Sequence, residues 1–153
     1  MNDNTNLAPL TGLEKILRLQ RILAESKSLP REILAYFAEC EDTELRLGVA
    51  MNPHCPAELL HILARDEDDE VAWTVAENPN TRVETLEFLA NHCNSDVRAS
   101  VLNRPRVPDE VLLTLADDID DHLRKEARDE LRRRGHWEKV KQYFEDDGGE
   151  GDE

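Results

Sequence analysis

The chain has 153 residues with 34 acidic and 19 basic side chains, and its formal net charge of −15 at pH 7 disfavours direct binding to nucleic-acid phosphates or anionic lipid. Such a charge is compatible with a protein partner that has a basic surface. Apolar runs are too short for a membrane-spanning helix, which needs about 18 or more apolar residues, and three well separated cysteines indicate free thiols in a reducing, cytoplasmic compartment.

The predicted structure begins with a short tail and a capping helix. Residues 1–9 lack the basic and apolar regions of a secretory signal, and we expect them to be flexible. Residues 10–29 are predicted to contain an amphipathic helix that caps the following repeats, because apolar residues recur there at helical spacing. These apolar residues are Leu13, Ile16, Leu17, Leu19 and Leu23.

A 26-residue pattern then occurs four times between residues 30 and 133. Its copies begin at Pro30, Pro56, Arg82 and Pro108. The apolar columns are Leu34/Leu60/Leu86/Leu112, Ala38/Ala64/Ala90/Ala116, Leu45/Val71/Val97/Leu123 and Val49/Val75/Val101/Ala127. A fixed period of this size predicts a solenoid, in which each unit buries its apolar face against its neighbours.

Each copy is predicted to contain two short helices. In the second copy Pro56 begins the first helix, and Glu58 in its first turn favours the positive end of the helix dipole. A polar turn follows, and its last residue is expected to cap the second helix. This position holds Thr43, Asp69, Ser95 and Asp121 in the four copies. Asn78-Pro79 ends the second helix, because the residue before a proline avoids helical backbone angles.

The C-terminal end is predicted to hold a second capping element. Gly135 ends the last repeat, and residues 134–144 are predicted to form a short helix. Its apolar side chains are Trp137, Val140, Tyr143 and Phe144. Residues 145–153, with the sequence EDDGGEGDE, have the composition of a disordered acidic tail.

The motif P-x-E-x-L-x-x-L-A, followed by V-R-x-x-V and Asn-Pro, resembles the leucine-rich repeat variant (LRV) family over residues 30 to about 131. The resemblance implies a right-handed superhelix of alternating α- and 3₁₀-like helices. We therefore expect an all-α protein, a right-handed α-solenoid of short helix pairs (α or 3₁₀) that forms a HEAT-like superhelix with helical caps. The family's founding type has an N-terminal cysteine cluster that holds an iron–sulfur centre. That cluster is not expected here, because no cysteine precedes Cys40.

One column of the repeat holds an arginine in three copies, Arg46, Arg98 and Arg124, and Ala72 in the other. The arginines lie four residues after Asp42, Asn94 and Asp120, respectively. We expect a ladder of Asp–Arg contacts that ties helix starts to their neighbours. A direct role in binding is the alternative.

A candidate partner-binding patch comes from positions of the second helices that are predicted to point outward. These are Leu47, Met51, Trp73 and Glu77. Exposed aromatic and methionine side chains often mark protein interfaces. The alternative is that Trp73 packs against a neighbouring turn or helix as ordinary structure.

The acidic turns between the two helices of each copy are a second candidate surface, because they occupy equivalent positions. The residues assigned to this surface are Asp66, Asp68, Asp69, Glu70, Asp117 and Asp118. They are expected either to steer a basic protein partner or to form a solvated edge with helix-capping carboxylates.

These features predict a protein–protein interaction module, a scaffold or adaptor, whose partner is a protein with a basic surface. The alternative is an acidic inhibitor or immunity-type protein that mimics nucleic-acid charge. No catalytic or phosphate-binding motif is present, so we expect no enzymatic activity and no cofactor. No metal site is expected either, because His54-Cys55 and His92-Cys93 are adjacent pairs without zinc-ligand spacing. The oligomeric state is left open.

Overall fold

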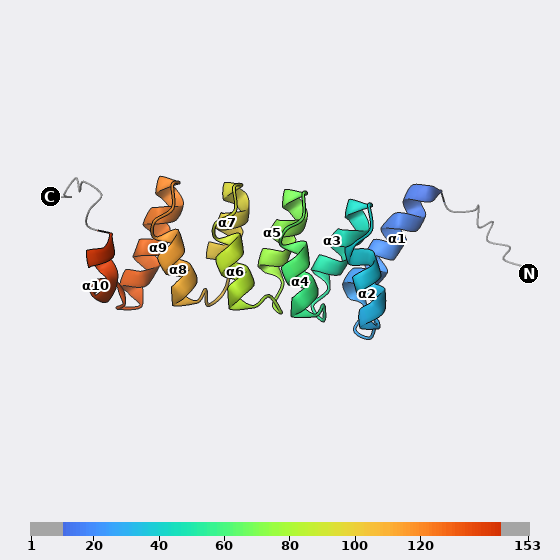
Figure 1. Cartoon of the computed structure of the whole chain (residues 1–153), viewed down its shortest axis with the longest axis horizontal. Helices are drawn as coiled ribbons and strands as arrows, with labels where there is room; N and C mark the ends of the chain where they lie inside the picture. The colour runs from blue at the N-terminus through green and yellow to red at the C-terminus, as the bar shows by residue number, and fades with distance from the viewer. Residues whose placement is uncertain (1–10, 145–153) are drawn as a thin grey trace, which may run out of the picture. The chain divides into compact units, whose positions relative to one another are not determined.

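The computed structural model describes residues 11–144, which form helices and connecting turns with no strand among them (Figure 1). The helices are α1 (Gly12–Glu25), α2 (Arg31–Ala38), α3 (Thr43–Met51), α4 (Ala57–Leu63), α5 (Asp69–Glu77), α6 (Val83–Leu89), α7 (Ser95–Leu102), α8 (Asp109–Leu115), α9 (Asp121–Arg133), α10 (Trp137–Val140) and the 3₁₀ helix η1 (Lys141–Tyr143). The all-α prediction is therefore confirmed. The predictions for residues 1–9 and 145–153 lie outside the described residues.

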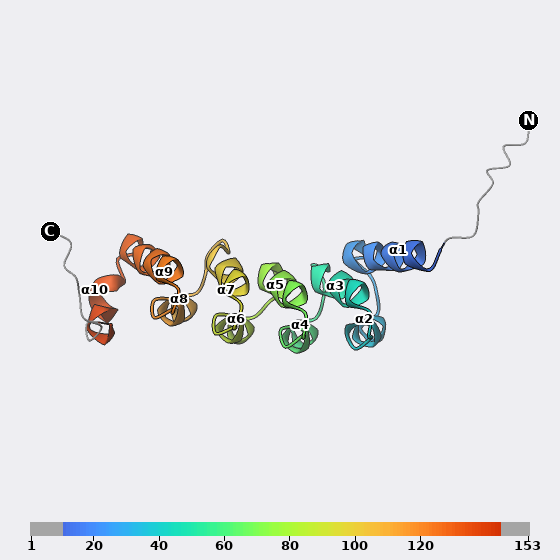
Figure 2. The same ribbon diagram turned by 90° about the horizontal axis from the view of Figure 1, so that it is seen from above.

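The chain divides into two compact units, unit 1 up to Thr81 and unit 2 from Arg82 onward. The described part of unit 1 contains α1 to α5, and that of unit 2 contains α6 to η1. In each unit short helix pairs follow the 26-residue period. Figure 2 shows α2 and α4 on one side of unit 1 and α3 and α5 on the other. In unit 2 it shows α6 and α8 on one side and α7 and α9 on the other. No described helix is both long enough and apolar enough to cross a bilayer.

The second helix of each pair is capped by the side chain of the residue directly before it. The N-caps are Asp42, Asp68, Asn94 and Asp120, and each side-chain oxygen accepts a hydrogen bond from the backbone N–H two residues further on, at 2.8–3.0 Å. The predicted caps, one residue further along, are therefore wrong and are the first helical residues instead. Proline occupies the N-cap position of α2, α4 and α8 without a side-chain hydrogen bond.

The repeated apolar columns form the core of each unit. In unit 1, Leu60, Val71 and Val75 have no exposed surface, and in unit 2, Leu112 and Val101 have none either. A fully buried leucine or valine side chain contributes roughly 1.5–3 kcal/mol relative to an exposed one. The period therefore sets the fold through burial, and all eight repeat helices are α-helical.

Two buried asparagines tie successive turns of unit 1 together. Asn52 donates to the carbonyl oxygens of Leu23 and Ser26, and Asn78 donates to those of Ala50 and Asn52 at 2.7 and 2.8 Å. Each amide thereby satisfies backbone acceptors that the ends of helices leave without an intrahelical partner. The Asn-Pro motif thus ends one helix and anchors its turn to the preceding one.

The capping helix α1 packs closely against α3. A Cβ atom at Gly48 of α3 would lie only 2.8 Å from the backbone oxygen of Gln20 and 3.0 Å from Cβ of Leu23. Glycine is needed here because the two helix backbones approach each other at this point. The prediction that α1 caps the repeats is consistent with this contact.

At the end of unit 2, the predicted single capping helix is broken into α10 and η1. Gly135 adopts a positive φ of 72°, which ends α9 as expected from the sequence. The rings of Trp137 and Phe144 stack with centroids 5.6 Å apart, and the Arg128 guanidinium lies over both rings. This aromatic–cation contact holds the short element against α9.

Candidate functional site

A groove of about 510 Å³ lies between the C-terminal ends of α2 and α4 in unit 1. The turn after α2 and the turn after α4 form its two walls. We call it groove 1, and it is lined by Ala38, Glu39, Cys40, Glu41, Arg46, Ile62, Leu63, Arg65, Asp66 and Glu67. Its position between two successive first helices follows from the 26-residue period.

The floor of groove 1 is a buried ion pair between Arg46 and Asp66. Nε and Nη2 of Arg46 donate to the two carboxylate oxygens of Asp66 at 2.7 and 2.9 Å, and only 8% and 6% of the two side chains are exposed. Nη1 donates to the backbone oxygens of Cys40 and Glu41, and Nη2 also donates to the Thr43 hydroxyl. All five N–H groups of the guanidinium therefore have acceptors.

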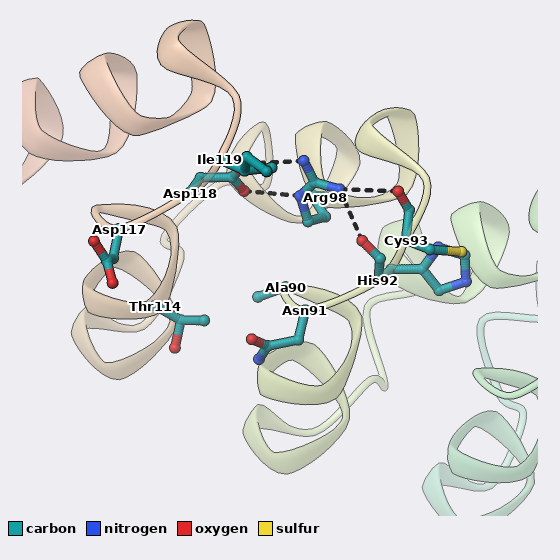
Figure 3. Close-up of a pocket in the computed structure, with 9 residues that line it drawn as sticks. All are labelled: Ala90, Asn91, His92, Cys93, Arg98, Thr114, Asp117, Asp118 and Ile119. Carbon is teal, nitrogen blue, oxygen red and sulfur yellow. Dashed lines mark hydrogen bonds and ion pairs between the residues drawn. The ribbon is translucent and has the colours of Figure 1, made fainter.

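Unit 2 contains an equivalent groove of about 300 Å³, which we call groove 2 (Figure 3). It is lined by Ala90, Asn91, His92, Cys93, Arg98, Thr114, Asp117, Asp118 and Ile119. Arg98 pairs with Asp118 at 2.8 and 2.9 Å and donates to the carbonyl oxygens of His92 and Cys93. The floor has the same construction as in groove 1.

Burial alone would raise the pKa of the Asp118 carboxyl. The hydrogen bonds from Arg98 and from the Asp120 backbone N–H, together with the charges of Arg98 and Arg124, outweigh burial and hold this pKa below its ordinary value. The carboxylate is thus charged and fully committed to the floor of the groove. The hydrogen bond to Asp118 correspondingly raises the pKa of the Arg98 guanidinium.

The arginine ladder expected from the sequence exists, but its partners differ from the predicted ones. Arg46 and Arg98 do not pair with the residues four positions before them, because Asp42 and Asn94 cap helices. Their carboxylate partners lie 20 residues further along, after the next first helix. Arg124 bonds locally instead, to the Asp118 carbonyl oxygen and to the Asp121 carboxylate.

The walls of the two grooves differ although the floors match. Side chains of six wall positions in groove 1 are replaced at the equivalent positions of groove 2. These pairs are Glu39 and Asn91, Cys40 and His92, Glu41 and Cys93, Ile62 and Thr114, Arg65 and Asp117, and Glu67 and Ile119. Groove 1 therefore has three glutamates and one arginine on its rim, whereas groove 2 has a single carboxylate, that of Asp117.

Sequence reasoning missed the exposed apolar side chains on the first helices. Ile62 in the wall of groove 1 is 51% exposed, and Tyr36, at the equivalent position of α2, is 70% exposed. In unit 2 the same position holds Phe88 in α6, which is 39% exposed. The signal was available in the sequence, since the three residues share one column of the repeat.

Leu47, predicted as an exposed anchor, is buried with 5% of its surface accessible, so this prediction is wrong. Helix α3 is buried on every side from Leu45 to Ala50, since α1, α2, α4 and α5 all pack against it. Met51 and Trp73 are exposed, at 53% and 39%, and Glu77 is exposed as well. Met51 instead borders a cavity of about 410 Å³ whose other lining residues belong to α1.

The predicted acidic surface is only partly available. Asp66 and Asp118 are buried ion-pair partners on the groove floors, which corrects their assignment to a docking edge. Asp68 is partly buried and caps α5. Asp69, Glu70 and Asp117 are exposed, as expected.

The three cysteines form no disulfide and have different environments. Cys55 is fully buried, and this burial raises the pKa of its thiol to about 12. Cys40 is partly buried and donates to the Phe37 carbonyl oxygen, whereas Cys93 is exposed in the wall of groove 2. Among the described residues of either unit taken alone, no three possible metal ligands converge.

Comparisons with protein-family models, with curated proteins and with solved structures found no match to this chain. The two grooves and the exposed side chains around them are the candidate binding surfaces of the chain.

Proposed function

We propose that this chain is a cytoplasmic protein-binding module, a scaffold or adaptor, built as a right-handed α-solenoid of the LRV type. The repeat-like packing of helix pairs in each unit and the 26-residue columns support this architecture. Repeat proteins of this kind use side chains on a regular scaffold to bind other proteins.

One observation carries the proposal: the grooves combine an equivalent floor with different walls. The Arg46–Asp66 and Arg98–Asp118 pairs hold the turns in the same geometry, while the residues above them vary in charge and size. A rigid, satisfied base positions side chains on the rim without loss of order, which favours specific recognition. Exposed Ile62 supplies an apolar contact of the kind found in protein interfaces.

The experiment that tests this function is site-specific photocrosslinking in native lysate. The crosslinking amino acid p-benzoylphenylalanine is placed at Ile62, Thr114 or Trp73, with Glu84 as an exposed control position. We expect a discrete protein adduct from at least one groove position and none from the control. Adducts from Trp73 alone would move the docking surface to the second helices, and the absence of protein adducts from all three positions would contradict the proposal.

A second candidate function is an acidic inhibitor that occupies a cationic nucleic-acid-binding site. The net charge of −15 and the exposed carboxylates of Glu67, Asp69, Glu70 and Asp117 favour it. This candidate predicts that a captured partner is released as salt rises and is displaced by DNA or RNA. A docking module that does not occupy a nucleic-acid-binding site predicts a complex that DNA and RNA do not displace, and this displacement separates the two candidates.

A further inference from the structure

The rim of groove 1 carries three exposed carboxylates that form no ion pair among the described residues, although the charge of Glu67 also acts on Arg46 at the floor. Glu39, Glu41 and Glu67 are exposed, and within residues 11–144 none of their side chains forms an ion pair. They differ in this respect from Asp66, whose carboxylate is saturated by Arg46 and by the Asp68 backbone N–H. The three charges are therefore available to a ligand.

The cations in groove 1 do not neutralise the negative charge of these three carboxylates. The Arg46 guanidinium lies on the floor and donates all five N–H groups to protein acceptors, and Asp66 balances its charge. Arg65 is exposed, and its Nη1 donates to the backbone oxygen of His61 at 2.7 Å. Three rim carboxylates against one exposed guanidinium leave the groove with a net negative rim.

Apolar surface accompanies these charges. Ile62 lies in the wall of the groove with half of its surface exposed, and Glu67 of the following turn lines the same groove. A carboxylate rim around an aliphatic wall fits a ligand that offers positive charges and an apolar side chain together. Groove 2 lacks this combination, because the matching positions hold Asn91, Cys93, Thr114 and Ile119.

We propose that groove 1 binds a protein segment that carries at least two lysine or arginine side chains close to an aliphatic residue. The basic side chains pair with the rim carboxylates, and the aliphatic side chain packs on Ile62. This proposal rests on the protein-binding function and names the chemistry of the partner at one of its surfaces.

The test is selection of peptides from a phage-displayed library of random 12-residue sequences on the full-length chain. We expect enrichment of sequences that combine two or more basic residues with leucine, isoleucine or valine. A selected peptide, synthesised and labelled, is then titrated against a triple rim variant. This variant is Glu39→Gln/Glu41→Gln/Glu67→Gln.

Loss of the rim charges should weaken binding about tenfold or more, as expected when two or more solvent-accessible charge pairs are lost together. A matched variant removes three exposed charges of unit 1 outside the groove. It is Glu25→Gln/Glu32→Gln/Glu77→Gln, and it should bind within about twofold of wild type because those charges lie farther from the ligand. Ile62→Thr, which introduces the residue of groove 2, should also weaken binding while leaving the helical signal unchanged.

A gain-of-function variant keeps the test independent of losses caused by misfolding. Asn91→Glu, Cys93→Glu, Thr114→Ile and Ile119→Glu together transfer the three rim carboxylates and the isoleucine of groove 1 to groove 2. The transferred rim should add a second binding site for the same peptide, visible as a doubled stoichiometry.

Three outcomes would overturn the inference: no enriched peptide, enriched peptides without basic residues, or equal losses in the rim and control variants. The second and third outcomes would leave the proposed protein-binding function standing. If the photocrosslinking positions also yield no protein adduct, the function itself fails, so the two failures are distinguishable.

Discussion

Arg46 and Asp66 lie 20 residues apart, yet their side chains form a two-point ion pair with N–O distances of 2.7 and 2.9 Å. The same interval separates Arg98 from Asp118. Where the arginine is replaced by Ala72, the residue 20 positions later is His92 and not aspartate. The sequence therefore keeps or loses the buried charges together, as expected because an unpaired buried charge is strongly destabilising.

Removal of one partner of the buried pair in unit 2 should be costly. Asp118→Ala leaves the Arg98 guanidinium buried without its carboxylate, and we expect a loss of about 3–5 kcal/mol in the free energy of unfolding. The double variant Arg98→Ala/Asp118→Ala should lose less than the sum of the single changes. Denaturant unfolding of the four proteins measures this coupling, and strict additivity would show that the pair is not a unit.

The exposed pair of Arg124 and Asp121 is a suitable comparison, since 91% of the Asp121 side chain is exposed. Asp121→Ala should change the free energy of unfolding by no more than about 1 kcal/mol.

The stability of unit 2 should depend on pH through Asp118. The pKa of this carboxyl is lower in the folded protein than its ordinary value of 3.8, so the folded state binds fewer protons than the unfolded chain. The stabilisation is complete above pH 3.8 and is lost as the pH falls through the folded-state pKa. Asp118→Asn should remove this dependence, with Asp117→Asn as the exposed control, in acid titrations followed by circular dichroism. Parallel acid unfolding of Asp118→Asn and wild type would contradict this assignment.

A methyl group at Gly48 should disturb the docking of α1. The new Cβ would meet the Gln20 backbone oxygen at 2.8 Å, a contact that requires the helices to separate. We expect Gly48→Ala to destabilise unit 1 by about 1–3 kcal/mol, the range typical of overpacking. Hydrogen exchange of α1 should increase most, and unchanged protection in α1 would show that the helix pair tolerates the shift.

Loss of the Asn78 side chain should weaken unit 1, because its amide satisfies the carbonyl oxygens of Ala50 and Asn52. Asn78→Ala leaves these acceptors without that donor, and we expect a loss of about 1–3 kcal/mol by thermal unfolding. Asn80→Ala removes a more exposed amide of the same turn and should cost less. Equal losses of stability in Asn78→Ala and Asn80→Ala would contradict the expectation that removal of the buried amide costs more.

The three thiols should react with a disulfide reagent at different rates at pH 8. Exposed Cys93 should react first, whereas Cys55, buried with its pKa raised to about 12, should react only after unfolding. Cys93→Ser should therefore remove the fast phase. A fast phase that survives this substitution would contradict the burial pattern.

The repeat could be predicted from the sequence because burial follows its period: Leu34 and Leu60 fall in one column and both are buried. The capping residues were displaced by one position because two neighbouring residues, such as Asp68 and Asp69, are both good N-caps. Composition does not choose between them, and only the backbone geometry of the turn does.

The candidate site was predicted less well, since it depends on contacts between distant residues. The helix position of Leu47 predicts that it points away from the repeat core, but it is buried in α3, a helix that packs against α1 as well as against its repeat neighbours. Local spacing predicts partners four residues before each arginine, whereas the shared loss of arginine at Ala72 and of aspartate at His92 indicates the 20-residue interval that the structure shows. The exposed column that includes Ile62 also recurs in the sequence, where Tyr36 and Phe88 occupy the same position of the repeat.

A chain of similar units has a particular folding hazard: a terminal helix can dock on the wrong copy. The column that contains Gly48 holds Thr74, Ser100 and Glu126 in the later copies, and each of these has a side chain where α1 requires none. The absence of a side chain at Gly48 therefore makes α3 the helix against which α1 can pack closely. Steric exclusion by the side chains at the equivalent positions disfavours docking of α1 on the other copies.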